Sequence, residues 1–243
     1  MTYRPQEFWD RRLSEQFDLR GTGQPGLSEA YNRACYELRR VVLDHALRAE
    51  GFDPQGRRVL DVGCGTGFFT AYYLARGAQL TGIDIAPTSI ERLRQRHPEA
   101  RFLPADVGET AIEGSFDLVN AFDVLYHITD DGRWQHAVRA LVSAVSPSGL
   151  LLLTDTFPPP DAVLGEAEHN RMRPLTRYRQ ILDPAGFEVR AILPTHVLLN
   201  RELGAFRFLN RAPGLLYAVD RALLTLGLGK DPAVSKLLVA RRV

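Results

Sequence analysis

The chain has 243 residues, of which 45% are hydrophobic and 24% charged, and its formal net charge is +1. This length and apolar content allow a single domain over residues 1–243 with a substantial core. The neutral charge balance, without a long basic run, argues against nucleic-acid binding. Cys35 and Cys64 lack the spacing of a disulfide framework or a zinc site. With no apolar run long enough to span a membrane, we expect a cytoplasmic protein without a metal.

Residues 1–54 are predicted to form a helical segment ahead of the sheet. Leu38, Val42 and Leu47 share a helix face, and Gly51 ends the pattern. Strand and helix patterns then alternate from residue 57 to residue 153, which is typical of a parallel sheet built from βαβ units. The helices of this region are predicted over 66–76, 87–97 and 134–145. Residues 147–149 should form a turn that leads into a strand over 150–155, buried on both faces.

The C-terminal third is predicted to hold a helix over 173–182, a strand within 186–199 and a closing strand over 235–241. The core then comprises residues 55–199 and 233–243. About thirty residues, 200–232, separate the last two strands, which is long for a loop. Leu215, Val219 and Leu226 recur there at helical spacing, so we expect a helical insertion. It could pack on the body, cover the substrate, form a homodimer contact or face a membrane; cover or dimer contact is favoured.

A glycine-rich loop follows the first predicted strand. Gly63, Gly65 and Gly67 alternate with small residues, and Asp61 stands two residues before the first of them. Glycine has no Cβ, so the backbone can turn sharply and lie against a ligand. The dinucleotide pattern G-x-G-x-x-G requires a third glycine at position 68, where this chain has Phe68. The spacing is therefore G-x-G-x-G.

Acidic residues follow the next two strands as well. Asp84 ends the run over 78–84, and Asp106 comes directly after the run over 100–104. Because parallel strands end at the same edge of a sheet, Asp61, Asp84 and Asp106 should converge on one crevice. An acid at the end of the second strand can accept hydrogen bonds from both hydroxyls of a ribose. A fourth strand over 115–122 leads into the segment 123–128.

These four segments, in this order, resemble the motifs of class I S-adenosylmethionine-dependent methyltransferases of the bacterial small-molecule type. The resemblance implies a Rossmann-like α/β fold with a doubly wound, seven-stranded, mainly parallel sheet. It implies that Asp84 binds the ribose and Asp106 the adenine amino group, and that Asp61 braces the glycine loop and faces the methionine ammonium. The residues it assigns to the S-adenosyl-L-methionine site are Asp61, Gly63, Cys64, Gly65, Gly67, Asp84, Ile85, Asp106, Val107 and Phe122.

Methyl transfer to a hydroxyl usually requires removal of its proton, for which histidine is suited near neutral pH. His127 lies just beyond the fourth strand, where the resemblance places residues next to the methyl group. It is the first candidate for a general base, and a wall of the pocket is the alternative. His169 follows the fifth strand and is the second candidate, with a solvated loop as its alternative.

Several residues are candidates for contact with a small-molecule acceptor. Arg171 and Arg173 could bind a carboxylate or phosphate, although exposed arginines are common. Trp9 and Tyr31 belong to the N-terminal segment, which in similar enzymes folds over the pocket, and packing against the sheet edge is the other interpretation of Trp9. Tyr126 lies beside His127.

The sequence thus predicts a metal-independent methyltransferase that acts on a small molecule in a biosynthetic pathway. The Asn/Asp-Pro-Pro-aromatic motif of nucleic-acid amine methylases has no counterpart after the fourth strand, where residues 121–124 read Ala-Phe-Asp-Val. Two other functions stay open: a cofactor-binding enzyme that catalyses a cyclisation or rearrangement, and a non-enzymatic binding protein.

Overall fold

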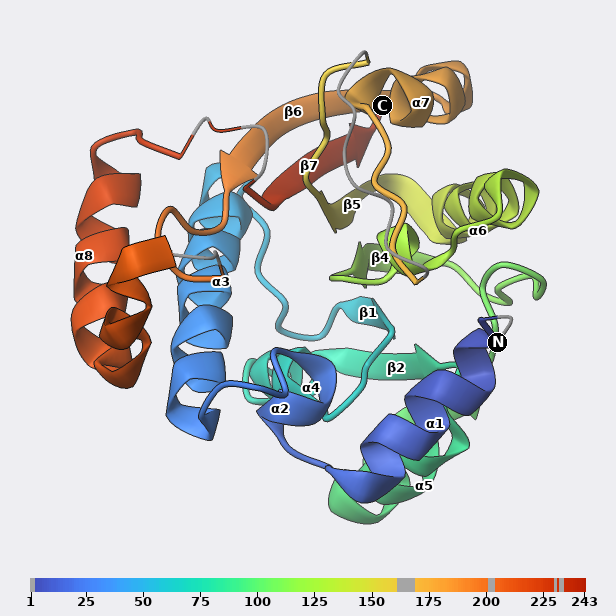
Figure 1. Ribbon diagram of the computed structural model, residues 1–243. Coiled ribbons are helices and arrows are strands. Elements are labelled where there is room, and N and C mark those ends of the chain that lie inside the picture. The colour runs from blue at the N-terminus through green and yellow to red at the C-terminus, as the bar shows by residue number, and fades with distance from the viewer. Residues whose placement is uncertain (1–2, 161–168, 201–203, 230, 232–233) are drawn as a thin grey trace.

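The fold is built on a seven-stranded sheet in the order β3-β2-β1-β4-β5-β7-β6 (Figure 1). The computed structural model describes residues 3–160, 169–200, 204–229, 231 and 234–243. The first five strands in this order pair in parallel, and β7 is antiparallel to both β5 and β6. The strands are β1 (Arg58–Val62), β2 (Gln79–Asp84), β3 (Arg101–Pro104), β4 (Phe116–Ala121), β5 (Val145–Asp155), β6 (Phe187–Pro194) and β7 (Lys236–Arg242). The Rossmann-like, mainly parallel sheet predicted from the sequence is confirmed.

Helices cover both faces of this sheet (Figure 1). They are α1 (Pro5–Glu15), α2 (Leu19–Thr22), α3 (Glu29–Ala49), α4 (Phe68–Leu74), α5 (Pro87–Arg96), α6 (Asp131–Ala144), α7 (Leu175–Leu182) and α8 (Pro213–Thr225), with 3-10 turns η1 (Leu125–His127), η2 (Asp183–Ala185) and η3 (Gly204–Arg211). Helices α3, α4 and α5 pack on one face, and α6 and α7 pack on the other. Apolar side chains therefore have to point from the sheet in both directions.

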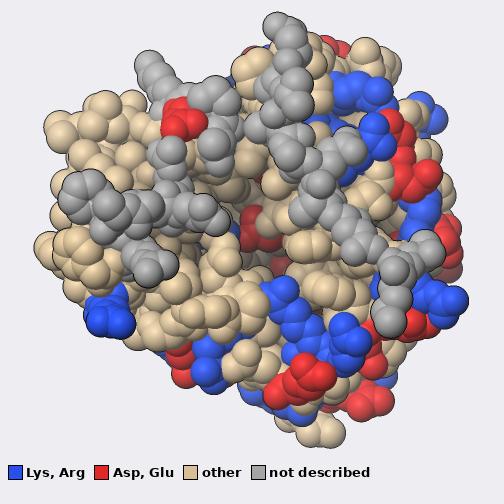
Figure 2. Space-filling model, in the orientation of Figure 1, with Lys and Arg blue, Asp and Glu red and all other residues tan. Residues whose placement is uncertain are grey.

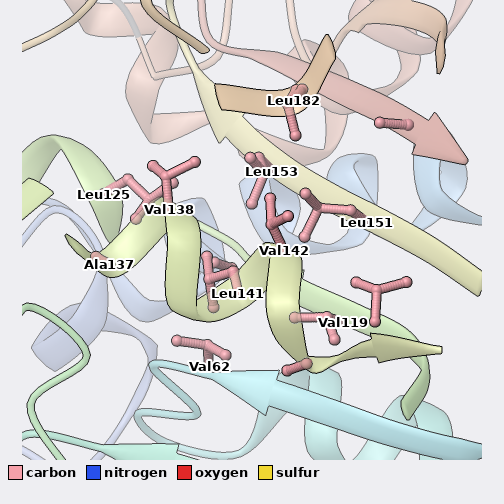
Figure 3. Packing of buried hydrophobic residues seen from close by; sticks show 14 of the residues in the cluster. Val62, Val119, Leu125, Ala137, Val138, Leu141, Val142, Leu151, Leu153 and Leu182 are labelled. Carbon is pink, nitrogen blue, oxygen red and sulfur yellow. The ribbon is translucent and has the colours of Figure 1, made fainter. Parts of the chain in front are cut away.

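The side chains of strand β5 pack alternately on the two faces of the sheet. Leu150 and Leu152 pack with α3 and α4, whereas Leu151 and Leu153 pack with α6 and α7. Figure 3 shows the second group with Val142 of α6 and Leu182 of α7. A strand side chain alternates faces at each residue, so a continuous apolar run is required where both faces are covered.

Two predicted boundaries differ from the structure by three residues or more. Helix α6 begins at Asp131 rather than at residue 134, because the Asp130 side chain accepts a hydrogen bond from the backbone N–H of Arg133 and caps the helix earlier. Strand β5 begins at Val145, so residues 147–149 lie within a strand and not in a turn. The pairing with β4 shifts register there and Ser148 has a φ of 60°, which indicates a bulge that absorbs the expected turn.

The predicted helical insertion is present as η3 and α8, and α8 lies alongside α3 (Figure 1). Leu216 of α8 is buried with Tyr31 and Leu38 of α3. The buried carboxylate of Asp220 accepts hydrogen bonds from the backbone N–H groups of Leu198 (2.6 Å) and Leu199 (2.8 Å). Helix α8 is thus fixed to the body by apolar packing and by a carboxylate that satisfies two backbone donors.

We expect Asp220→Ala to lower the free energy of unfolding by about 2–4 kcal/mol, because two backbone N–H groups would lose a charged acceptor. Urea titration followed by circular dichroism measures this change. Thr225→Ala on the exposed side of the same helix is the control and should stay within about 0.5 kcal/mol of the wild type. Equal loss in both variants would show that the Asp220 contacts do not hold the insertion.

Candidate functional site

A deep cleft opens at the carboxyl ends of β1, β2 and β4, where the strand order changes direction. Ligands bind at this switch point in open α/β sheets. The space in the cleft, together with the open solvent at its mouth, amounts to about 1240 Å³. Figure 2 shows a hollow near the centre of this face with acidic atoms inside it.

The glycine loop forms one wall of the cleft. Gly63, Gly65 and Gly67 all have positive φ, at 69°, 51° and 86°, a region that side chains with a Cβ rarely adopt. A Cβ on Gly63 would lie 2.3 Å from Val124 Cγ2, and one on Gly65 would lie 2.7 Å from Thr22 Cγ2. The backbone therefore needs glycine here both for its conformation and for the close approach of neighbouring segments.

Asp84 connects the end of β2 to the glycine loop. Its Oδ2 accepts a hydrogen bond from the Gly65 N–H and its Oδ1 from the Ala86 N–H, both at 2.8 Å. Burial raises the pKa of Asp84 to about 6, although these two N–H donors lower it in part. A carboxylate has about four acceptor sites, so two remain for a ligand in the cleft.

The other two predicted acids also line the cleft. The buried carboxylate of Asp61 accepts hydrogen bonds from the Thr70 hydroxyl (2.7 Å) and the Asn120 amide (2.8 Å), which joins β1 to α4 and β4. Burial raises the pKa of Asp61. Asp106 accepts a hydrogen bond from the backbone N–H of Gly108 and forms an ion pair with Arg133 of α6. No sequence pattern indicated the contact between Asp106 and Arg133.

The remaining residues assigned to the cofactor site lie in the same cleft. Its lining includes Cys64, Ile85, Val107 and Phe122. The thiol of Cys64 is buried 3.9 Å from the Ser89 hydroxyl oxygen, which fits the interpretation of a small residue that fills the loop. Nine of the ten residues that the sequence assigned to this site line the cleft, and the tenth, Gly67, precedes α4 and is absent from the lining.

The N-terminal segment covers the glycine loop. Trp9 and Leu13 of α1 and Thr22 of α2 line the cleft. The Tyr36 hydroxyl of α3 donates to the Thr22 hydroxyl at 2.8 Å, and the Asp10 carboxylate accepts from the Thr88 N–H at the start of α5 at 2.8 Å. The cover is therefore attached to the body by hydrogen bonds on two sides of the cleft.

His127 lines the cleft at η1, just after β4, with the Trp9 ring edge-on at 4.8 Å. Its Nδ1 lies 3.0 Å from the carbonyl oxygen of His169. A carbonyl only accepts, so Nδ1 carries the proton and Nε2 the lone pair. Burial lowers the pKa of His127 to about 4, although the His169 carbonyl raises it in part. At neutral pH His127 is thus an uncharged base.

Of the six other catalytic and acceptor-binding candidates, Trp9 lines the cleft, whereas the lining does not include His169, Tyr31, Tyr126, Arg171 or Arg173. The His169 ring stacks on His127 at 6.1 Å between ring centroids. Tyr31 is fully buried, and its hydroxyl accepts from the Asn200 N–H at 2.8 Å. The Tyr126 ring lies 4.4 Å from His127, and its carbonyl accepts from the Arg171 N–H at 2.7 Å.

Arg171 and Arg173 are occupied by protein partners. Both contact the Asp131 carboxylate at the start of α6, at 3.2 Å and 3.1 Å. The buried Arg173 guanidinium also donates to the Ile128 carbonyl at 2.8 Å and stacks on Trp134 at 4.7 Å. The two arginines hold the segment after β4 against α6, which leaves neither placed to bind an anionic acceptor in the cleft.

The sequence analysis missed a buried ion pair at the cleft between Arg39 of α3 and Asp123 (2.8 Å). Asp123 has a φ of 58°, and its carboxylate also accepts from the Thr154 hydroxyl at 3.1 Å. A non-glycine residue held at positive φ by its surroundings is frequent at functional sites. One signal was available: Arg39 interrupts the apolar stripe that runs from Cys35 to Leu43 along α3.

Within the described residues, no group of three or more His, Cys, Asp or Glu side chains could hold a metal ion. The same part of the chain contains no helix that is long and apolar enough to cross a membrane.

Solved structures with this fold are numerous. Magnesium protoporphyrin IX methyltransferase from Synechocystis PCC 6803, solved with bound S-adenosylmethionine, matches 98% of this chain and 95% of its own with a TM-score of 0.63 and 18% identity. The [4+2]-cyclase SpnF matches 84% of this chain and 80% of its own with a TM-score of 0.57 and 21% identity. At these identities the likeness shows the fold alone.

Sequence relatives include the ubiquinone biosynthesis O-methyltransferase of Chromobacterium violaceum, which is 38% identical over 101 residues, or 39% of this chain and 42% of the relative. The chain thus spans less than half the length of this curated relative. The family model for the methyltransferase domain matches residues 34–192, more than half of the chain. This match includes the glycine loop, the three acids of the cleft and His127. The chain therefore belongs to the methyltransferase-domain family, whose members take the methyl group from S-adenosylmethionine.

Proposed function

We propose that this protein transfers a methyl group from S-adenosylmethionine to a small-molecule acceptor in a biosynthetic pathway. The observation that carries the proposal is the continuity of one cleft. Its lining runs from the acids Asp84 and Asp106 through the glycine loop to His127 and Asp123. A cofactor half and an acceptor half therefore share a single space, with the end of β4 between them.

The cofactor half fits a nucleoside with a cationic amino-acid tail. Asp84 offers two free acceptor sites to ribose hydroxyls, and Asp61 supplies negative charge toward an ammonium. Because Gly63 and Gly65 lack a Cβ, Val124 and Thr22 can pack closely against the loop that lines this half. When bound, S-adenosylmethionine supplies an electrophilic methyl group on a sulfonium, so the protein has to position and deprotonate the acceptor.

The acceptor half favours an uncharged or cationic molecule with apolar surface. Trp9 and Phe68 line it, and aromatic walls bury a large apolar area. Among the described lining residues the cationic side chain is Arg133, which is paired with Asp106. Since Arg171 and Arg173 are held by Asp131, an acceptor carboxylate or phosphate would lack a counter-charge.

His127 is the proposed general base. Its Nδ1–H is held by the His169 carbonyl, so the Nε2 lone pair can take a proton from an acceptor hydroxyl. Asp123 lies on the same segment, and its remaining acceptor sites can orient the same O–H or N–H group. His169 would then act through His127 rather than on the acceptor.

The proposal is tested by measuring S-adenosylhomocysteine after adding candidate acceptors from a metabolite library that contains phenols, amines and carboxylates. Product that forms only with an acceptor supports methyl transfer. The likeness to SpnF gives the second candidate, a cyclisation or rearrangement, because that fold hosts a cyclase. Conversion of an added compound without S-adenosylhomocysteine would favour this second function.

We expect Asp84→Ala to weaken S-adenosylmethionine binding about 30- to 1000-fold, which corresponds to the loss of about 2–4 kcal/mol from two charge-assisted hydrogen bonds. The carboxylate is the acceptor, and its pKa is about 6. Wild-type affinity should therefore fall as the pH is lowered through 6, whereas the variant should show no such dependence. Calorimetric titration between pH 5 and 8 measures both effects, and equal affinities would remove Asp84 from the site.

Gly65→Val should abolish cofactor binding. The backbone at φ 51° is strained for valine, and the side chain would enter the space between the loop and Thr22. Circular dichroism shows whether the fold survives. Gly26→Val is the matched control, since a Cβ there meets no atom within 4 Å. Retained binding in Gly65→Val with a normal spectrum would mean that the loop does not contact the cofactor.

His127→Ala should lower the turnover rate by about 10²–10⁴ with little change in cofactor affinity, because the base acts only in the transition state. A pKa of about 4 replaces the unperturbed value expected from the sequence, so the wild-type rate should rise through pH 4 and stay flat above pH 6. Single-turnover methyl transfer across this range measures the profile. A loss below about tenfold would make His127 a wall of the pocket.

The lowered pKa of His127 can also be tested without an acceptor, through the pH dependence of the protein's stability. The folded-state pKa of His127 lies below the unfolded value of 6.5, so the unfolded chain binds more protons between pH 4 and 6.5. Stability from this residue is thus complete above pH 6.5 and is lost as the pH falls toward 4. The wild type should lose more stability over this window than His127→Gln, and equal slopes would show that His127 is not buried as a neutral base.

A further inference from the structure

The insertion before β7 carries a concentrated apolar surface. Among the described residues, five of the six exposed large hydrophobic side chains belong to it: Phe208, Leu215, Val219, Leu226 and Leu228, which are between 37% and 73% exposed. We call these five residues the α8 patch. Scattered exposed apolar residues are ordinary, but a contiguous group marks a surface that is covered in use.

Helix α8 is apolar on both sides. Its inner side packs Leu216 and Leu224 against α3 and the body, while Leu215, Val219 and Leu226 recur every four to seven residues on the outer side. A surface helix normally turns a polar face to water. The outer stripe is therefore unsuited to water.

Among the described residues of η3 and α8, the exposed charges are cationic, and the nearest described acid beyond them is the partly exposed Asp231. Arg211 and Arg221 are exposed at its margins. The acid of this helix, Asp220, is fully buried and is bound to the backbone N–H groups of Leu198 and Leu199. The exposed part of α8 is thus apolar with a cationic margin, which is the composition of helices that lie in the headgroup region of an anionic membrane.

A second copy of the chain fits this surface less well. A symmetric dimer places the same patch on both sides of the contact, so Arg211 and Arg221 would meet arginines with no exposed acid of α8 to pair with. Stable protein interfaces use about 20–30 residues from each partner, far more than the α8 patch and its margins provide. A bilayer needs neither complementary shape nor paired charges from a partner.

We infer that the α8 patch binds the surface of a membrane that contains anionic lipids, with α8 lying in the headgroup region and not across the bilayer. The insertion also contacts the cover of the cleft: the Gln24 amide donates to the Asn200 side-chain oxygen at 2.9 Å, and the Asn200 N–H donates to Tyr31. Membrane contact would therefore occur on the element next to the cover. This inference does not depend on the methyl-transfer chemistry.

Vesicle sedimentation tests the inference directly. The full chain should sediment with vesicles of 70% phosphatidylcholine and 30% phosphatidylglycerol, and more weakly with pure phosphatidylcholine. The triple variant Leu215→Ser, Val219→Ser and Leu226→Ser should bind at least about tenfold more weakly, because the buried apolar area is lost. Since the three side chains are exposed, the variant should fold, and its circular dichroism spectrum and S-adenosylmethionine titration check this.

Two charge-reversal variants distinguish attraction of the vesicles to the α8 patch from an effect of the protein's net charge. Arg221→Glu at the patch should weaken binding to the anionic vesicles about fivefold or more. Arg139→Glu, an exposed arginine of α6 on the other face of the sheet, should leave binding unchanged. No binding by the wild type, or equal binding by the triple variant, would overturn the inference. So would a wild-type dimer in analytical ultracentrifugation that the triple variant dissociates.

Discussion

The contact between the Asp84 carboxylate and the Gly65 N–H is the interaction on which the site depends. It fixes the glycine loop to the end of β2 at 2.8 Å, and the second oxygen of the same carboxylate holds the start of α5 through Ala86. One side chain therefore sets the distance between two neighbouring βα connections. Because it is buried, its pKa is raised to about 6, which means that the loop is held by a group whose charge is maintained by its hydrogen bonds.

The cover and the body form the cleft together. Thr22 of α2 packs against the loop at Gly65, and its hydroxyl is held by Tyr36, which is one turn before Arg39 on α3. Arg39 in turn holds Asp123 in a left-handed conformation at the end of β4. Contacts from one helix thus reach both the cofactor half and the acceptor half. A change in the cover can affect both halves without touching the glycine loop itself.

Two features of the molecule depend on whether a side chain is buried or exposed to water. In the cleft, burial keeps His127 uncharged at neutral pH and so leaves its lone pair available. On α8, apolar side chains remain exposed to water while the acid of the helix is buried. The first arrangement prepares a group for chemistry, and the second prepares a surface for contact. Each is stable only because the neighbouring elements, α1 over the cleft and α3 under the insertion, hold it in place.

The sequence by itself determined the sheet, the glycine loop and the three acids, because strand periodicity and glycine spacing are local properties that parallel pairing converts into one crevice. It also predicted the helical insertion and the place of His127 just beyond the fourth strand. Tertiary structure decided the rest. Arg171 and Arg173 pair with Asp131, Tyr31 is buried beneath the insertion, and Arg39 reaches Asp123 across 84 positions of the chain. Such contacts join residues far apart in sequence, so no local pattern encodes them, and only the packed chain shows which polar side chains remain free for a ligand.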